Sequence, residues 1–238
     1  AEKLVHLQMD YRGGDLSVVQ ITDTHLGVAE DATLAGVNTA HSLGSILTAI
    51  SEEQKPDLML FTGDLADDGS SPAYARLKQM TAQFCCAKAW LPGNHDNAQQ
   101  MRAAAPEFMA GTIGAGPWGI IMLNSQVPGE IGGALAEFEL ERLACFLRDE
   151  RYRYFLLCVH HQPLPVNSRW LDEQRIANGR QFLHLLDQRK VKGVLWGHVH
   201  QQFDGWHGKV RLLATPSTCV QFAPGSEDFK VDHAGPGY

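Results

Sequence analysis

The sequence lacks three features that would assign it to common classes of protein. No apolar run approaches the roughly 18–20 residues of a membrane-spanning helix, and residues 1–11 show neither a secretory nor a lipidation signal. Basic residues are the minority, with 20 Lys and Arg against 27 Asp and Glu and a formal net charge of −7. This balance opposes nucleic-acid binding, which requires clustered cations. We therefore expect no nucleic acid and no membrane among the partners.

Cysteine is also scarce, and its five residues form no CxxC pair. An odd number without metal-type spacing indicates buried, reduced thiols and a cytoplasmic location. The adjacent Cys85 and Cys86 are interpreted as strand residues rather than as a redox switch. With 238 residues, of which 44% are hydrophobic and 20% charged, the composition is typical of one globular domain. The residue type that stands out is histidine, with eleven copies.

Short apolar runs alternate with helical patterns along the chain. The runs predict buried strands at Leu16–Thr22, Asp57–Thr62, Phe84–Leu91, Trp118–Asn124, Arg153–Val159 and Lys192–Trp196. The helical patterns span Ala40–Gln54, Pro72–Gln83 (after Ser71 as N-cap), Ala136–Glu150 and Gln174–Gln188. Gln201–Trp206 and Lys209–Thr215 predict a hairpin. Strands alternating with helices predict an α/β fold.

Five of the predicted strands end in polar motifs. These are Asp23-Thr24-His25, Gly63-Asp64, Gly93-Asn94-His95-Asp96, His160-His161 and Gly197-His198-Val199-His200. Because ligands of open α/β sheets bind beyond the carboxyl ends of the strands, we expect the motifs along one edge. Each motif alone is typical of a turn or a structural histidine, but five in order predict a functional site. The other histidines are interpreted as surface residues: His6, His41, His184, His207 and His233.

The motifs supply nitrogen and oxygen ligands, from Asp23, His25, Asp64, Asn94, His160, His198 and His200. Such a set suits iron, manganese or zinc better than a thiolate-seeking metal. Residues i and i+2 of an extended segment point the same way, so Asp23/His25 and His198/His200 should each direct two ligands into one cavity. Seven ligands exceed what one ion takes while keeping solvent. We therefore predict two ions that share Asp64, a pair that can stabilise both oxygens of a phosphoryl displacement.

In order and spacing, these motifs resemble the calcineurin-like metallophosphoesterase family, with the pattern DxH…GD…GNH[DE]…H…GHxH over essentially the whole chain. The resemblance implies a four-layer αββα sandwich of two mixed β-sheets flanked by helices. It implies a single domain over residues 1–238 that lacks part of the family's C-terminal end.

The resemblance also implies individual roles. It places one metal on Asp23, His25, Asp64 and His200, and the second on Asp64, Asn94, His160 and His198. It places the catalytic His95 beside the substrate phosphate with Asp96 orienting it, and makes His25, Asp64, Asn94, His95 and His200 the substrate-binding residues.

Stretches outside the ligands narrow the resemblance. Gln20–His25, Leu123–Gly129, His161–Pro165, Ser168–Asp172 and Leu213–Phe222 closely resemble the bacterial class III 3′,5′-cyclic-AMP phosphodiesterases. This implies hydrolysis of cAMP to AMP by a hydroxide that two metal ions activate. Iron (Fe2+/Fe3+) and manganese (Mn2+) are favoured, and other divalent ions are possible. Gln162 departs from the residue that relatives often show.

Two alternatives stay open at this point. Another diester, such as a 2′,3′-cyclic nucleotide or a glycerophosphodiester, would use the same metal site, because one fold serves many substrates. A metal-stabilised scaffold without activity is disfavoured, since a scaffold has no need of His95. The sequence leaves open whether His95 is a general acid or a charge stabiliser, and whether His161 supports the site or the core. It does not predict an oligomeric state.

Adenine recognition also stays open. Four aromatic residues could stack on a base, although each is also interpreted as a packing residue: Trp170, Phe203, Trp206 and Phe222.

Overall fold

The largest sheet formed by the described residues has seven strands in the order β1-β7-β8-β9-β10-β12-β11. The computed structural model describes residues 5–53 and 55–238. The strands are β1 Val5–Gln8, β7 Ala110–Ala115, β8 Trp118–Leu123, β9 Tyr154–Val159, β10 Val191–Trp196, β11 Phe203–His207 and β12 Val210–Ala214. Strands β8, β9, β10 and β12 run parallel, whereas β7–β8 and the predicted hairpin β11–β12 are antiparallel. This sheet is therefore mixed, as expected.

The smaller sheet has the order β2-β5-β6, with β2 at Val18–Ile21, β5 at Leu58–Thr62 and β6 at Ala87–Leu91. Both of its described pairings are parallel, so the expectation of a mixed sheet is wrong here. The reason is local: a helix connects each strand to the next, and a helical crossover returns the chain in parallel. A two-stranded ribbon of β3 (Thr33–Leu34) and β4 (Val37–Asn38) precedes the first helix.

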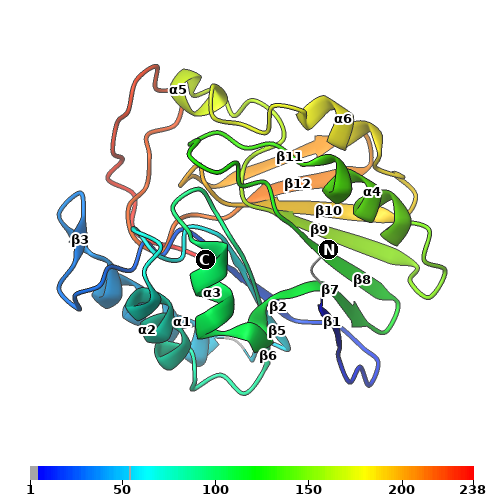
Figure 1. The fold of residues 1–238 in the computed structure, drawn as a ribbon, viewed down its shortest axis with the longest axis horizontal. Helices are drawn as coiled ribbons and strands as arrows, with labels where there is room; N and C mark the ends of the chain where they lie inside the picture. Colours follow the sequence, from blue (N-terminus) through cyan, green and yellow to red (C-terminus); the bar gives the residue numbers. More distant parts are fainter. Residues whose placement is uncertain (1–4, 54) are drawn as a thin grey trace.

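Helices cover the outer face of each sheet (Figure 1). Beside the smaller sheet lie α1 (Thr39–Glu53), α2 (Ser71–Met80) and α3 (Ala98–Ala104), followed by a 3-10 turn at Pro106–Phe108. Beside the larger sheet lie α4 (Glu137–Phe146), α5 (Arg169–Asp172) and α6 (Gly179–His184).

Two helix starts differ from the prediction. The N-cap of α2 is Ser70 rather than Ser71, and its side chain makes no capping bond. Helix α6 begins at Gly179, five residues later than expected. The predicted end of the first helix at Gln54 lies outside the described residues.

Alternating side chains divide the interior into three cores. On β5, Leu58 and Leu60 face the core between the sheets, where they pack with residues such as Cys158 of β9. Met59 and Phe61 point the other way, into the core beneath the helices of the smaller sheet. A third core lies between the larger sheet and its own helices. Helix, sheet, sheet and helix thus form the four predicted layers, and burial on both faces explains the continuous apolar runs.

The cysteines correct one expectation. Cys85 and Cys86 lie just before β6, which begins at Ala87, so they are not strand residues. All five thiols are free, yet only Cys158 and Cys219 are buried; Cys85 and Cys145 are exposed. Among the described residues, no helix is long and apolar enough to cross a membrane.

Candidate active site

The five motifs meet where the two sheets end together. Strands β2, β5 and β6 of the smaller sheet lead into Asp23, Asp64 and Asn94, and β9 and β10 of the larger sheet lead into His160 and His198. Carboxylate and imidazole atoms from these motifs form groups whose members lie within 4.8 Å of one another: Asp23/His25/His200, His25/Asp64/His95, Asp23/Asp64/His160 and His160/His161/His198. The predicted convergence is confirmed, although the strands come from two sheets.

The first half of the site contains Asp23, His25 and His200. Nε2 of His200 lies 3.2 Å from Nε2 of His25 and 3.2 Å from Oδ1 of Asp23. Ligand atoms around one ion, at bonds of about 2.1 Å, stand roughly 3.0–3.4 Å apart. The three atoms therefore have the spacing of ligands to a common ion.

The second half contains His160 and Asn94, and Asp64 connects it to the first. Oδ2 of Asp64 lies 3.3 Å from Nε2 of His160 and 3.8 Å from Nε2 of His25. Oδ1 of Asn94 lies 3.3 Å from the same His160 nitrogen. One oxygen of Asp64 thus faces ligands of both halves, the position predicted for a shared carboxylate.

Backbone and carboxylate acceptors orient three of the rings. Nδ1 of His160 donates to the carbonyl of Thr62 at 2.8 Å, and Nδ1 of His200 donates to that of Val220 at 2.7 Å. Nδ1 of His25 lies 3.0 Å from Oδ1 of Asp67. Each bond leaves Nε2 facing the centre, where the neutral ring can use this nitrogen to coordinate a metal ion. This arrangement fits a metal.

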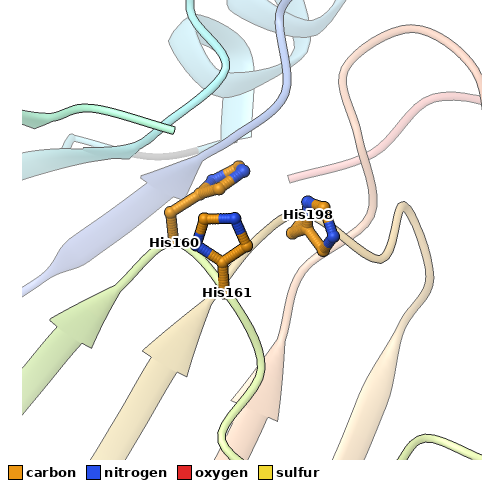
Figure 2. Close-up of side chains that lie close together, drawn as sticks. All are labelled: His160, His161 and His198. Carbon is orange, nitrogen blue, oxygen red and sulfur yellow. The ribbon is translucent and has the colours of Figure 1, made fainter. Parts of the chain in front are cut away.

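His198 and His161 differ, although their rings and that of His160 form one group with centroids 4.6–5.2 Å apart (Figure 2). Nε2 of His198 is buried without a hydrogen-bond partner, which fits a metal ligand. Both nitrogens of His161 are occupied, by the Ser125 hydroxyl at 2.7 Å and the Ile131 carbonyl at 3.0 Å. His161 therefore supports the site by anchoring the 125–131 loop.

The electrostatics of the site favour positive charge at its centre. Burial raises the pKa of Asp64, but the charge of His160 and its hydrogen bond outweigh burial and hold that pKa well below its usual range. Burial likewise raises the pKa of Asp23, but the charge of His200 and its hydrogen bond to Asp23 outweigh burial, so that the pKa of Asp23 is lowered. Burial lowers the pKa of His160, while Asp64 and Asp23 raise it to about 9. Two buried carboxylates thus stay ionised and attract a cation.

Five proposed ligands have left-handed backbone, which is unusual for residues other than glycine. Asp23, His25, Asp64, His198 and His200 have φ between 43° and 64°. This corrects the expectation that i and i+2 residues converge through extended backbone. The turned backbone directs both members of each pair inward at about 1–2 kcal/mol per residue, a cost that proteins tolerate at functional sites.

Two glycines allow the loops to approach one another. A Cβ on Gly93 would lie 2.2 Å from Oδ1 of Asp64, and one on Gly63 would lie 2.4 Å from Nδ1 of His160. Gly63 also has φ of +98°. Only glycine therefore fits at these two positions beside the ligands.

The role expected of Asp96 is wrong, because its carboxylate does not face the His95 ring. Its oxygens accept hydrogen bonds from the amides of Leu65, Ala66 and Gly93 at 2.9–3.1 Å. The Tyr74 hydroxyl donates a further bond at 2.9 Å. Burial and then the charge of Asp64 raise the pKa of Asp96 to about 6. Asp96 connects the loops that carry Asp64 and Asn94.

The His95 ring is positioned by Asp67, which sequence reasoning missed. Nδ1 of His95 donates to the Asp67 carbonyl at 2.8 Å, while the Asp67 carboxylate contacts His25. The side chain of His95 is 42% exposed, so a substrate can reach this ring from solvent. The acidic run after Asp64, Leu-Ala-Asp-Asp, was the available signal. Gln126 was also missed; its amide donates to the carbonyl of Gly93 at 2.9 Å.

The remaining candidates lie elsewhere. His6, His41, His184 and His233 are exposed and His207 is half-buried, so the interpretation of the first four as surface residues is confirmed. Gln162 is buried and donates to the carbonyl of Leu171 at 2.7 Å.

The sequence pattern of the calcineurin-like phosphoesterases matches residues 16–202, and these residues include every proposed ligand. The chain belongs to the calcineurin-like phosphoesterase family. Calcineurin-like phosphoesterases are metal-dependent, and the ligand groups described above support a dinuclear site.

Curated relatives in this family align over most of the chain. A protein of Escherichia coli K12 named 3′,5′-cyclic adenosine monophosphate phosphodiesterase CpdA is 43% identical over 228 residues, which cover 93% of this chain and 82% of the relative. Its namesake in Pseudomonas aeruginosa is 38% identical over 225 residues, covering 93% and 83%. A Nostoc protein named 3′,5′-cyclic-nucleotide phosphodiesterase alr5338 is 36% identical over 229 residues, covering 94% and 86%.

Two solved phosphatase structures share the fold. A dimetal phosphatase from Danio rerio superposes with a TM-score of 0.68 at 14% identity, covering 90% of this chain and 91% of that one. The purple acid phosphatase PPD1 of yellow lupin superposes with a TM-score of 0.57 at 14% identity, and the match covers 92% of this chain and 45% of that one. At such identities the likeness shows the fold alone.

Proposed function

We propose that the protein hydrolyses 3′,5′-cyclic AMP to 5′-AMP at a dinuclear metal site. The observation that carries the proposal is the position of Asp64, whose Oδ2 faces His25 in one half of the site and His160 in the other. The substrate is supported by the names of relatives that are 36–43% identical over more than nine-tenths of the chain.

The proposed ligands of one ion are Asp23, His25, Asp64 and His200, and those of the other are Asp64, Asn94, His160 and His198. Their oxygen and nitrogen atoms are compatible with iron and manganese, which we propose as the pair. When bound, the two ions supply a nucleophile at neutral pH and neutralise charge on the phosphodiester.

The protein's own residues then bind and orient the diester. The Asn94 amide can donate to a non-bridging phosphate oxygen as negative charge develops there. The His25 ring lies 4.8 Å from that of His95 and 5.1 Å from that of His200, so these three side chains would surround a phosphate bound at the centre. Because Nδ1 of His95 is engaged by the Asp67 carbonyl, Nε2 is the nitrogen that would act on the leaving 3′-oxygen. When protonated, His95 can donate to that oxygen as a general acid.

The proposal includes the domain and the cellular compartment in which the reaction takes place. We propose that residues 1–238 act as one catalytic domain in the cytoplasm, with AMP as the product. Five unpaired cysteines are compatible with a reducing compartment.

Turnover of a diester panel tests the proposal. Protein loaded with iron and manganese is assayed at matched concentrations on 3′,5′-cyclic AMP, 2′,3′-cyclic AMP and a glycerophosphodiester. We expect kcat/KM to be highest for the 3′,5′-cyclic nucleotide. Faster turnover of either other diester would reassign the substrate, and no turnover of any diester by the metal-loaded protein would indicate a scaffold.

A further inference from the structure

A group of three aromatic rings lies directly beside a proposed metal ligand. The Phe222 ring stacks on that of His200, with centroids 4.1 Å apart and planes inclined by 10°. Trp170 and Phe229 contact Phe222 at 5.1 and 5.4 Å, and they contact each other at 5.4 Å. Ring contacts therefore extend without a break from the metal centre to Phe229.

Phe229 is exposed although its loop is anchored. Its side chain is 62% exposed, whereas Trp170 and Phe222 are half-buried. The amide of Ala223 donates to the carbonyl of Lys230 at 2.8 Å, and the Trp170 indole donates to Ser226 Oγ at 3.0 Å. Binding residues are found disproportionately on loops that a rigid scaffold positions, and an aromatic ring on such a loop can stack on a planar ligand.

The loop has room for a flat ligand. Residues 223–230 line a hollow of about 440 Å³, and Phe229 meets Trp170 and Phe222 at steep angles of 74° and 68°. Such edge contacts hold the ring in place, and its 62% exposure shows that they leave most of its surface open.

The structure distinguishes this group from the other aromatic candidates. The Phe203 ring packs against the buried Trp196 at 5.2 Å, so it belongs to the core. Trp206 lies on the edge strand β11, where the Arg211 guanidinium sits 5.7 Å from its ring. Among the four candidates from the sequence, Trp170 and Phe222 are the pair connected to His200.

We propose that Phe229, supported by Trp170 and Phe222, is the stacking surface for the purine base of the substrate. This inference rests on the proposed cyclic-nucleotide phosphodiesterase function and identifies residues that determine its specificity. Every base presents a π-face, and stacking on an aromatic side chain contributes about 1–3 kcal/mol. A purine offers more area than a pyrimidine, so the surface favours cyclic purine nucleotides.

The kinetic test compares 3′,5′-cyclic AMP with base-free ribose 3′,5′-cyclic phosphate, which has the same reacting atoms. For Phe229→Leu we expect kcat/KM on cyclic AMP to fall about 5- to 100-fold, mainly through KM. Turnover of the base-free compound should stay within about twofold. Phe229→Tyr keeps a π-face and should retain activity. The matched control is Trp206→Leu, at a position that is 64% exposed. This variant should leave kcat/KM unchanged on both substrates.

Two outcomes would overturn the proposal. Equal losses on both substrates would show that Phe229 only shapes the loop, and unchanged turnover of cyclic AMP would place the base elsewhere.

A binding measurement tests the stacking surface independently of turnover, and so distinguishes failure of the stacking proposal from failure of the proposed function. If the wild type hydrolyses no diester, AMP and ribose 5-phosphate are titrated while the fluorescence of Trp170 is followed, with Trp170→Phe as the blank. Tighter binding of AMP that Phe229→Leu weakens would retain the stacking surface. Equal binding of both ligands would reject it.

Discussion

The hydroxyl of Tyr74 on helix α2 donates a hydrogen bond of 2.9 Å to Oδ1 of Asp96, and both side chains are buried. The same hydroxyl accepts a bond of 2.8 Å from the amide of Asn97. Asp96 in turn bonds to backbone amides of the loops that carry Asp64 and Asn94. A residue that touches no proposed ligand thus helps to position several of them.

Tyr74→Phe should therefore reduce activity without altering any group that contacts substrate. The substitution removes one of the three hydrogen bonds to Oδ1 of Asp96 and takes the hydroxyl acceptor from the Asn97 amide. Loss of an acceptor for a buried donor costs about 1–3 kcal/mol of stability. Urea unfolding measures this loss, and kcat should fall more than KM rises because the reacting groups shift. Tyr154→Phe, a half-buried tyrosine on β9, is the control. Wild-type kcat in Tyr74→Phe would contradict the role of this network.

Asp64→Ala should abolish binding of both metal ions, because one oxygen of this carboxylate faces both halves of the site. Asn94→Ala removes a ligand of the second ion only and should leave the first bound. Elemental analysis of the purified variants gives the number of ions per chain. Two ions retained in Asp64→Ala would refute the ligand assignment.

Gly93→Ala should displace the metal ligands although it adds a single methyl group. The new Cβ would lie 2.2 Å from Oδ1 of Asp64 and 2.7 Å from Cε1 of His160. We expect loss of metal together with about 1–3 kcal/mol of stability, the usual cost of overpacking. Gly44→Ala on α1 is the control, since its Cβ meets nothing closer than Met80 Cε at 4.0 Å. The Gly44→Ala variant should be more stable than the wild type by about 0.5–1 kcal/mol, because glycine inside a helix is destabilising relative to alanine. Full metal occupancy in Gly93→Ala would show that the loops can separate.

His95→Ala should reduce turnover of cyclic AMP by about 10²–10⁴-fold if His95 is a general acid. A diester with a good leaving group, such as bis(4-nitrophenyl) phosphate, does not need this proton and should lose far less. His41→Ala, an exposed histidine on α1, serves as the control. Equal losses on both diesters would leave His95 only the role of stabilising charge.

The sequence predicted the three strands of the smaller sheet and the three central strands of the larger one, because burial on both faces produces continuous apolar runs. It missed β1 and β7, whose residues Val5–Gln8 and Ala110–Ala115 pair with each other across about a hundred residues. The mostly exposed side chains of β1 and the small side chains of β7 mark these strands poorly, since only the neighbouring strand defines them. It also missed α3, a seven-residue helix that Asn97 caps at its N-terminus.

The sequence by itself determined which side chains belong to the site, because each proposed ligand follows an apolar strand in one ordered set. Only the tertiary structure decided how they are oriented. The carbonyls of Thr62 and Val220 select the nitrogen that His160 and His200 direct at the centre, and that of Asp67 orients His95. Every residue has a carbonyl, so no residue type marks these acceptors. Their positions become known only when the fold brings distant loops together.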